Sequence, residues 1–270
     1  MSTWDDGTKV AFGPLGLVGR IRAVIKVLMM ALIIFGLMGP MILLRFAGFH
    51  TVSQSLVTLA CRGVLRVIGL RVLSRGSPMQ NGGAVVSNHC SWMDIFTLNA
   101  VQKVLFVAKA EVRGWALIGL IARSVGTVFI ERKKSQAARQ RDVIEARVLD
   151  GKKVLFFPEG TSTDGLRVLP FRSTLFAAFF SDKLKKTTWI QPVTVAYHAP
   201  DDMDSRVYGW WGGADFAPHL FIILAMPKQG WAEVIFHEPI KVSEVADRKE
   251  LAKMCGDVVR TGLEDALKVG

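Results

Sequence analysis

A histidine and an aspartate stand five positions apart, directly after a short apolar run. The run at 84–86 is followed by the polar segment SNHCSWMD at 87–94, which contains His89 and Asp94. On one regular helix these two residues would lie roughly 140° apart around the axis and would not meet. They can pair when His89 lies in the turn before a helix and Asp94 lies in its first turns. An aspartate bonded to one imidazole nitrogen leaves the other free to take a proton from a hydroxyl, so the pattern predicts a general base.

Two further segments carry polar residues at predicted strand ends. FPEGTS at 157–162 follows an apolar run, and its Glu159, Gly160 and Thr161 can present a carboxylate and backbone donors to a polar ligand. GTVFIER at 126–132 brings Arg132 to the end of another strand, where a guanidinium can bind a phosphate through two hydrogen bonds. Taken singly, the three segments also fit structural interpretations: a helix start with an incidental histidine, a strand-to-loop turn and a surface arginine.

Alternating strands and helices position these segments. Short apolar runs predict strands, and the stretches between them have helical patterns. The predicted strands lie at 84–86, 104–107, 127–130, 154–157, 189–195 and 233–236, and the predicted helices lie at 92–98, 114–125, 135–149, 171–184 and 243–267. This alternation predicts an α/β fold with a mostly parallel sheet and surrounding helices. Each polar segment follows a strand, at the end where α/β enzymes place their sites.

Residues 1–78 have a different pattern, and we expect them to form membrane-associated helices before the α/β domain at 79–270. The apolar run at 27–44 holds about 18 residues, the lower limit for a helix that crosses a bilayer. Pro40 interrupts it, which predicts a kink or break there. Basic residues flank the run on both sides. This symmetry favours two helices that dip into one leaflet; the alternatives are a single membrane-spanning helix and a buried core helix. Residues 52–73 predict a basic amphipathic helix, lying on a membrane or packed on the domain.

Composition and charge narrow the range of partners. Half of the 270 residues are hydrophobic and the net charge is +11, with a mean hydropathy of +0.32 and a pI near 9.8. Such a chain favours an anionic partner, either nucleic acid or a membrane surface. No nucleic-acid-binding motif accompanies the charge, so we expect a lipid bilayer and no nucleic acid. Three cysteines without a CxxC pair, and histidines scattered singly, predict neither disulfides nor a metal site and fit a reducing compartment.

Together and in this order, the segments at 87–94, 126–132 and 157–161 resemble the lysophosphatidate acyltransferase family of glycerolipid synthesis, whose signature opens with H-x4-D. A fourth family element, a proline between apolar residues on a strand, is similar to IQPV at 190–193. The resemblance covers roughly residues 80–200. The H-x4-D motif followed by FPEGT is far more specific than either part alone.

The resemblance implies a mechanism that agrees with the local chemistry. His89 would act as the general base on a lysolipid hydroxyl, and Asp94 would orient the imidazole. The hydroxyl would attack the thioester of acyl-ACP or acyl-CoA directly, with no acyl-enzyme, no cofactor and no metal. By the same resemblance, four residues would contact the acceptor head group: Arg132, Glu159, Gly160 and Thr161. Lys109 matches a family lysine and is a fifth predicted substrate-binding residue.

The sequence departs from the family pattern at two motif positions. Ser162 stands where the third motif usually has arginine, and Glu131 stands where the second commonly has aspartate. The missing arginine weakens the case for a phosphomonoester acceptor, although Arg167 and Arg172 are available to compensate. The segment GWWGGAD at 209–215, continuing to PHL at 218–220, is similar to acyltransferases proposed for lyso-ornithine lipid, and it also fits an aromatic-rich interfacial loop.

We therefore expect a membrane-bound lysophospholipid acyltransferase that converts lysophosphatidate to phosphatidate, with lyso-ornithine lipid as the alternative acceptor. The active site is expected at the cytoplasmic face of a bacterial inner membrane, where ACP and CoA thioesters are made. A lysolipid hydrolase and a non-catalytic membrane binder are the competing functions. The hydrolase would need a nucleophile, and no G-x-S-x-G segment surrounds Ser87, Cys90 or Ser91.

Overall fold

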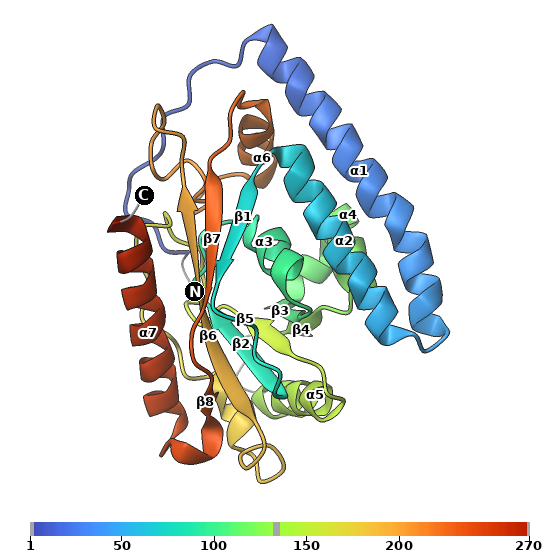
Figure 1. Ribbon diagram of the computed structural model, residues 1–270, viewed down its shortest axis with the longest axis vertical. Helices are drawn as coiled ribbons and strands as arrows, with labels where there is room; N and C mark the ends of the chain where they lie inside the picture. Colours follow the sequence, from blue (N-terminus) through green and yellow to red (C-terminus); the bar gives the residue numbers. More distant parts are fainter. Residues whose placement is uncertain (1–2, 132–135, 269–270) are drawn as a thin grey trace.

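The computed structural model describes residues 3–131 and 136–268 (Figure 1). Its centre is a sheet of eight strands in the order β1-β7-β6-β2-β5-β3-β4, with β8 paired to β6. The strands are β1 (Arg71–Arg75), β2 (Gly83–Ser87), β3 (Leu105–Lys109), β4 (Val128–Ile130), β5 (Val154–Phe156), β6 (Trp189–His198), β7 (Trp231–Phe236) and β8 (Ile240–Lys241). Only β6 pairs antiparallel, with β7 and β8, among the described strands. The predicted α/β fold with a mostly parallel sheet is confirmed.

Helices cover both faces of the sheet. They are α1 (Leu17–Phe46), α2 (His50–Ile68), α3 (Asp94–Val101), α4 (Ala116–Ser124), α5 (Ala137–Leu149), α6 (Phe216–Ala225) and α7 (Arg248–Lys268), with 3-10 turns at Ala110–Gly114, Leu175–Phe180 and Val242–Glu244. Side chains alternate along a strand, so Val85 packs toward α1, α2, α3 and α6 while Ala84 and Val86 pack toward α5 and α7. Figure 1 shows α7 on one side of the sheet and α1, α2 and α3 on the other. The central strand β2 is buried along its whole length, as expected for a parallel sheet covered twice.

The N-terminal helices form a hairpin in which α1 and α2 run side by side (Figure 1). Of the kink or break predicted at Pro40, the break is wrong, because α1 continues through Pro40 to Phe46. The chain reverses instead at Gly48, whose φ of +83° is a left-handed conformation that glycine adopts without strain. Ser53 Oγ on α2 donates to the Met41 carbonyl on α1 at 3.0 Å and ties the two helices together.

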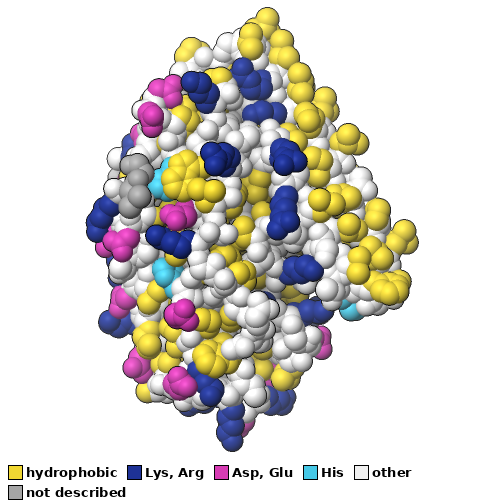
Figure 2. Space-filling view, in the orientation of Figure 1, with side chains coloured by type: hydrophobic (Ala, Val, Ile, Leu, Met, Phe, Trp, Pro, Cys, Tyr) yellow, Lys and Arg dark blue, Asp and Glu magenta, His cyan; other side chains and the backbone are white. Residues whose placement is uncertain are grey.

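Helix α1 leaves most of its apolar surface open. Of the described helices, α1 alone is long and apolar enough to cross a membrane, with 30 residues and 11% of its most apolar window buried. Figure 2 shows the resulting band of hydrophobic side chains along one edge of the molecule. This exposure excludes the buried core helix among the sequence-based alternatives and points to membrane association.

Several boundaries differ from the sequence-based predictions. Helix α2 ends at Gly69, a left-handed C-cap, and the chain then forms β1 within the segment predicted as helix 52–73. Within the predicted helix at 171–184, the structure has a 3-10 helix of six residues, Leu175–Phe180. The division into 1–78 and 79–270 stays a prediction, and β1 of the first segment pairs with β7 of the second.

Candidate active site

The His89 and FPEGTS segments meet because the strands that precede them are neighbours. Strands β2 and β5 pair in parallel, with Ala84 opposite Val154 and Val86 opposite Phe156. Their carboxyl ends therefore lie at the same edge of the sheet. The Thr163 amide donates to the His89 carbonyl at 2.9 Å, which joins the two loops directly.

His89 and Asp94 form a close pair. His89 Nδ1 lies 2.6 Å from Asp94 Oδ2, with His89 in the turn before α3 and Asp94 at its first residue. Asp94 is 0% exposed. Its Oδ2 also accepts hydrogen bonds from the Cys90 and Ser91 amides at 2.9 and 3.0 Å. These donors and the helix N-terminus hold the carboxylate in place, so that it can orient the imidazole.

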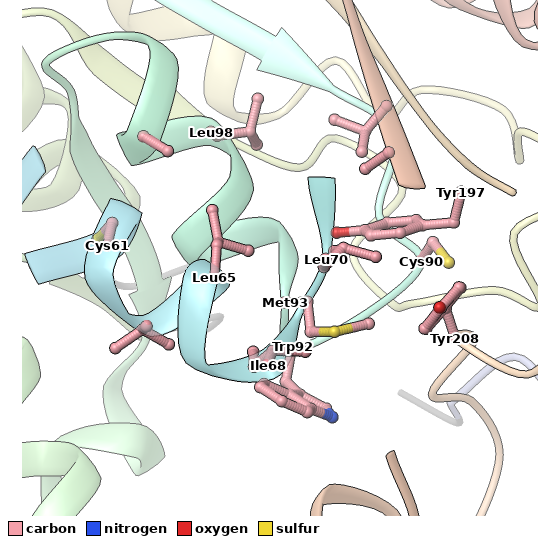
Figure 3. Close-up of a cluster of buried hydrophobic side chains, with 14 of the residues drawn as sticks. Cys61, Leu65, Ile68, Leu70, Cys90, Trp92, Met93, Leu98, Tyr197 and Tyr208 are labelled. Atoms are coloured by element: carbon pink, nitrogen blue, oxygen red, sulfur yellow. The ribbon is translucent and has the colours of Figure 1, made fainter. Parts of the chain in front are cut away.

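A tyrosine outside the sequence motifs completes the environment of Asp94. Tyr197 Oη, on β6, donates to Asp94 Oδ1 at 2.8 Å and lies 3.1 Å from Thr97 Oγ1. Burial, together with the charge of Asp94, raises the pKa of Tyr197 well above its usual value, so the phenol keeps its proton. Both carboxylate oxygens of Asp94 are thus held. Figure 3 shows Tyr197 beside Cys90 in the buried cluster around this loop.

Glu159 holds the backbone of the His89 loop. Its Oε1 accepts from the His89 amide at 2.7 Å, and its Oε2 accepts from the Leu169 amide at 2.8 Å. The residue is 1% exposed, and burial raises the pKa of its carboxyl to about 8 against the opposing effect of these two amides. The sequence predicted that Glu159 contacts the acceptor. In the structure both of its oxygens are bonded to backbone amides, so Glu159 positions the loop, and its contact with the acceptor stays a prediction.

Two side chains fix the His89 ring, and a third holds its loop. Asp94 binds Nδ1, and the Phe157 ring stacks on the imidazole with centroids 4.1 Å apart and an interplanar angle of 11°. Asn88 anchors the loop, because its side-chain amide donates to the Val195 carbonyl and accepts from the Val195 amide, both at 2.8 Å. The His89 side chain remains 21% exposed, and Nε2 is the ring nitrogen left to meet a substrate.

Gly160, Thr161 and Lys109, also predicted to bind substrate, lie at or near the same edge of the sheet. Gly160 has a φ of +77° in the turn after β5. Thr161 Oγ1 accepts from the Trp4 amide at 3.2 Å, so the N-terminal segment crosses this loop. Lys109 ends β3 and is exposed. Arg132 lies outside the described residues.

The segment at 209–220 packs against the His89 loop and is partly helical. The Trp210 amide donates to the Cys90 carbonyl at 2.8 Å, and Ser162 Oγ donates to the Trp210 carbonyl. Helix α6 then brings His219 to Trp92, whose Nε1 donates to His219 Nδ1 at 3.0 Å. Burial lowers the pKa of His219 to about 4, so the ring is a neutral acceptor. The segment therefore packs against the His89 loop and is not only an aromatic-rich interfacial loop.

Cys90 does not have the properties of a nucleophile. The residue is 2% exposed, and burial with the nearby Asp94 charge raises the pKa of its thiol well above the usual range. A thiol that stays protonated and closed to solvent cannot attack a thioester. The paired His89 and Asp94 can instead deprotonate a hydroxyl supplied by a substrate.

Comparison with known proteins agrees with this chemistry. A family model described as Acyltransferase matches residues 65–196. The chain is 51% identical over 216 residues to a lyso-ornithine lipid O-acyltransferase of Rhodobacter capsulatus, covering 80% of this chain and 78% of that one. It is 39% identical over 118 residues to a 1-acyl-sn-glycerol-3-phosphate acyltransferase of Neisseria meningitidis, covering 43% and 46%.

A solved structure shares the fold. The crystal structure of a 1-acyl-sn-glycerophosphate acyltransferase from Thermotoga maritima superposes with a TM-score of 0.63 at 22% identity, covering 92% of this chain and 97% of that one. The structural similarity shows the fold, whereas the identity and coverage of the Rhodobacter capsulatus relative show the family. This chain belongs to the acyltransferase family and is an acyltransferase of the lysophospholipid type.

Proposed function

We propose that this protein transfers a fatty acyl group from a thioester donor to the hydroxyl of lyso-ornithine lipid, with His89 as general base. The observation that carries the proposed chemistry is the 2.6 Å contact between His89 Nδ1 and the buried Asp94. It leaves Nε2 as the base and places a negative charge where an imidazolium would form. The 51% identity to the Rhodobacter capsulatus enzyme supports the acceptor.

The proposed reaction needs one base and no enzyme nucleophile. Nε2 of His89 takes the proton of the acceptor hydroxyl as its oxygen attacks the thioester carbonyl. The tetrahedral intermediate collapses with cleavage of the carbon–sulfur bond, and the departing thiolate receives the proton from His89. Asp94 remains ionised throughout and stabilises the transient imidazolium. The protonation state of His89 is thereby restored for the next turnover.

The FPEGTS loop supports an acceptor other than a phosphomonoester. Where the family motif continues with arginine, Ser162 donates to the Trp210 carbonyl. Arg167, a suggested substitute, instead pairs with Asp164 at 2.8 Å and stacks over the Trp4 ring at 5.0 Å. An ornithine head group carries a carboxylate and an ammonium, so it needs fewer cations than a phosphomonoester. Arg132, Gly160, Thr161 and Lys109 remain our proposed head-group contacts.

Lysophosphatidate is the second candidate acceptor. It is favoured by the motifs at 87–94 and 157–161, which follow one another in the order typical of the family, and by the Neisseria meningitidis relative. In either case the acyl donor is proposed to be acyl-ACP or acyl-CoA. We place the enzyme at the cytoplasmic face of a bacterial inner membrane, with the hairpin of α1 and α2 dipping into one leaflet.

Acyl transfer by the purified full chain in detergent tests the proposal. Labelled acyl-ACP and acyl-CoA are offered with lyso-ornithine lipid, lysophosphatidate or another lysophospholipid, and the His89→Ala variant is assayed in parallel. Transfer to lyso-ornithine lipid that is lost in the variant supports the proposal. Transfer to lysophosphatidate alone keeps the mechanism and replaces the acceptor. Release of free fatty acid without an acceptor would support the hydrolase instead.

A further inference from the structure

A basic cavity lies at the edge of the sheet opposite the candidate active site. Its volume is about 360 Å³, and it is enclosed by the turn between α1 and α2, the end of α4 and the end of α5. Leu105 and Lys152, which line it, stand at or just before the amino ends of β3 and β5. Because β2, β3 and β5 are parallel, His89 follows the other end of this strand layer. The cavity is therefore separate from the transfer chemistry.

Three half-buried cations line this cavity: Arg45, Arg147 and Lys152. Arg45 donates to the Ser124 carbonyl at 3.2 Å. Burial, and then the positive charge of Arg147, lower the pKa of Arg45. Among the described residues, none of the three forms an ion pair, and Asp150 is the single carboxylate that lines the cavity. Positive charges that lie close together in a partly desolvated cavity repel one another, and a bound anion would offset this repulsion.

The N-terminus of α2 opens onto the same cavity. His50, its first residue, and Ser53 both line the space. The helix has 19 residues, no acidic residue in its first turn and no side-chain cap on its N-terminal amides. The His50 amide donates to the Gly48 carbonyl at 2.9 Å, and the N-terminus of the helix carries the positive end of its dipole. A helix N-terminus and convergent arginines are together the usual elements of a phosphate site.

We propose that this cavity binds the phosphate group of an anionic membrane lipid. The turn that borders the cavity supports a lipid as the source, because Phe46 and Phe49 are 88% and 58% exposed there. These two rings adjoin the open apolar face of α1, so the cavity lies beside the surface that we propose contacts lipid. Inorganic phosphate shares the same chemistry, so the experiment must separate the two sources.

Calorimetric titration of the full chain in dodecyl maltoside, a phosphate-free detergent, tests this site. The probes are dihexanoyl phosphatidylglycerol, dihexanoyl phosphatidylcholine and inorganic phosphate. We expect saturable binding of phosphatidylglycerol, weakened about fivefold by Arg147→Gln and again by Lys152→Gln, the effect of one cation at an anionic lipid surface. Phosphatidylcholine should bind more weakly, since its head group is zwitterionic. Inorganic phosphate binding as tightly as the lipid would assign the same phosphate site to a soluble anion.

A matched variant separates the cavity from the general positive charge of the protein. Arg141 lies on α5 like Arg147 but is exposed and does not line the cavity. Arg141→Gln should therefore bind phosphatidylglycerol as the unmodified chain does. Equal weakening by Arg141→Gln and Arg147→Gln, or unchanged binding in the Arg147→Gln, Lys152→Gln double variant, would overturn the proposal.

The outcome is independent of the proposed acyl transfer. In detergent, the double variant should transfer acyl chains to a soluble short-chain acceptor at the rate of the unmodified enzyme. His89→Ala, in contrast, should bind phosphatidylglycerol normally while losing transfer. Failure of one proposal is thus visible without failure of the other.

Discussion

The loop that carries His89 and the helix α1 differ in what surrounds their side chains. In the loop, buried polar groups are bonded to other buried groups: Asp94 accepts from two amides and Tyr197, and Glu159 accepts from two more amides. Along α1, apolar side chains such as Leu28 and Leu32 are exposed to the surroundings, at 64% and 75%. Burial of polar groups needs bonded partners, whereas exposed apolar groups need a lipid phase. One region therefore determines chemistry and the other determines location.

Replacement of His89 should have the largest effect and should be confined to chemistry. His89→Ala removes the general base, which contributes about 10²- to 10⁴-fold to such reactions. We expect kcat for acyl transfer to fall by that factor, while cosedimentation with vesicles is unchanged.

Cys90→Ala is the matched control for His89→Ala, because the two residues are adjacent and the Cys90 thiol is closed to solvent. It should retain transfer within a few-fold of the unmodified enzyme. An acyl group trapped on Cys90, or full activity of His89→Ala, would show that His89 is not the general base of this loop.

The pKa of Glu159 predicts a pH-dependent stability within the loop. Its carboxyl has a pKa of about 8 in the folded protein and an ordinary value near 4.5 when unfolded. Between these values the folded state binds more protons, so its stability is full below pH 4.5 and falls as the pH rises through 8. We expect the free energy of unfolding to decrease by roughly 5 kcal/mol across this window.

Glu159→Gln supplies the test of this dependence. The amide cannot ionise, so urea unfolding of the variant in detergent should vary less with pH than unfolding of the unmodified chain. The variant also loses one backbone hydrogen bond, because an amide nitrogen cannot accept, and it should be less stable at pH 5. An unchanged pH slope in the variant would assign the titration to another group.

The sequence predicted the His89 and Asp94 contact because its determinants are local. A strand, a turn and a helix start follow within eight residues, and strand neighbours brought Glu159 to the same edge. Tyr197 was missed because it lies 103 positions from Asp94 and no motif marks it. The loop contacts of Glu159 were not predicted because a motif reveals residue type, whereas burial depends on how the 157–169 loop folds. Similarly, Pro40 marked a possible break, but the turn formed at Gly48.

Charging the outer face of α1 should change location without changing chemistry. Leu28→Glu with Leu32→Glu places two carboxylates on the most open part of the helix, and lipid partitioning should fall about 100-fold. Transfer in detergent should remain. Vesicle cosedimentation measures the first effect and the detergent assay the second.

The control for this variant is Val258→Glu on α7, a helix whose apolar face is largely buried and where Val258 is 36% exposed. It adds a carboxylate at a distance from α1 and should leave vesicle binding unchanged. A similar loss of binding in Val258→Glu would mean that net charge, and not the apolar face of α1, holds the protein on the membrane.

Replacement of Tyr197 should have the smallest effect. It tests whether the buried hydrogen bonds of the loop act on His89 through Asp94. Tyr197→Phe removes one hydrogen bond to a buried carboxylate, and kcat should fall about tenfold with KM little changed. A loss in kcat without a change in KM separates an effect on the chemical step from weaker substrate binding. Tyr208→Phe also removes a hydroxyl, one that donates to Gln229 and accepts from Gly230, away from Asp94. It should lower stability and leave kcat in place, whereas an equal loss of kcat in both variants would reduce Tyr197 to a packing residue.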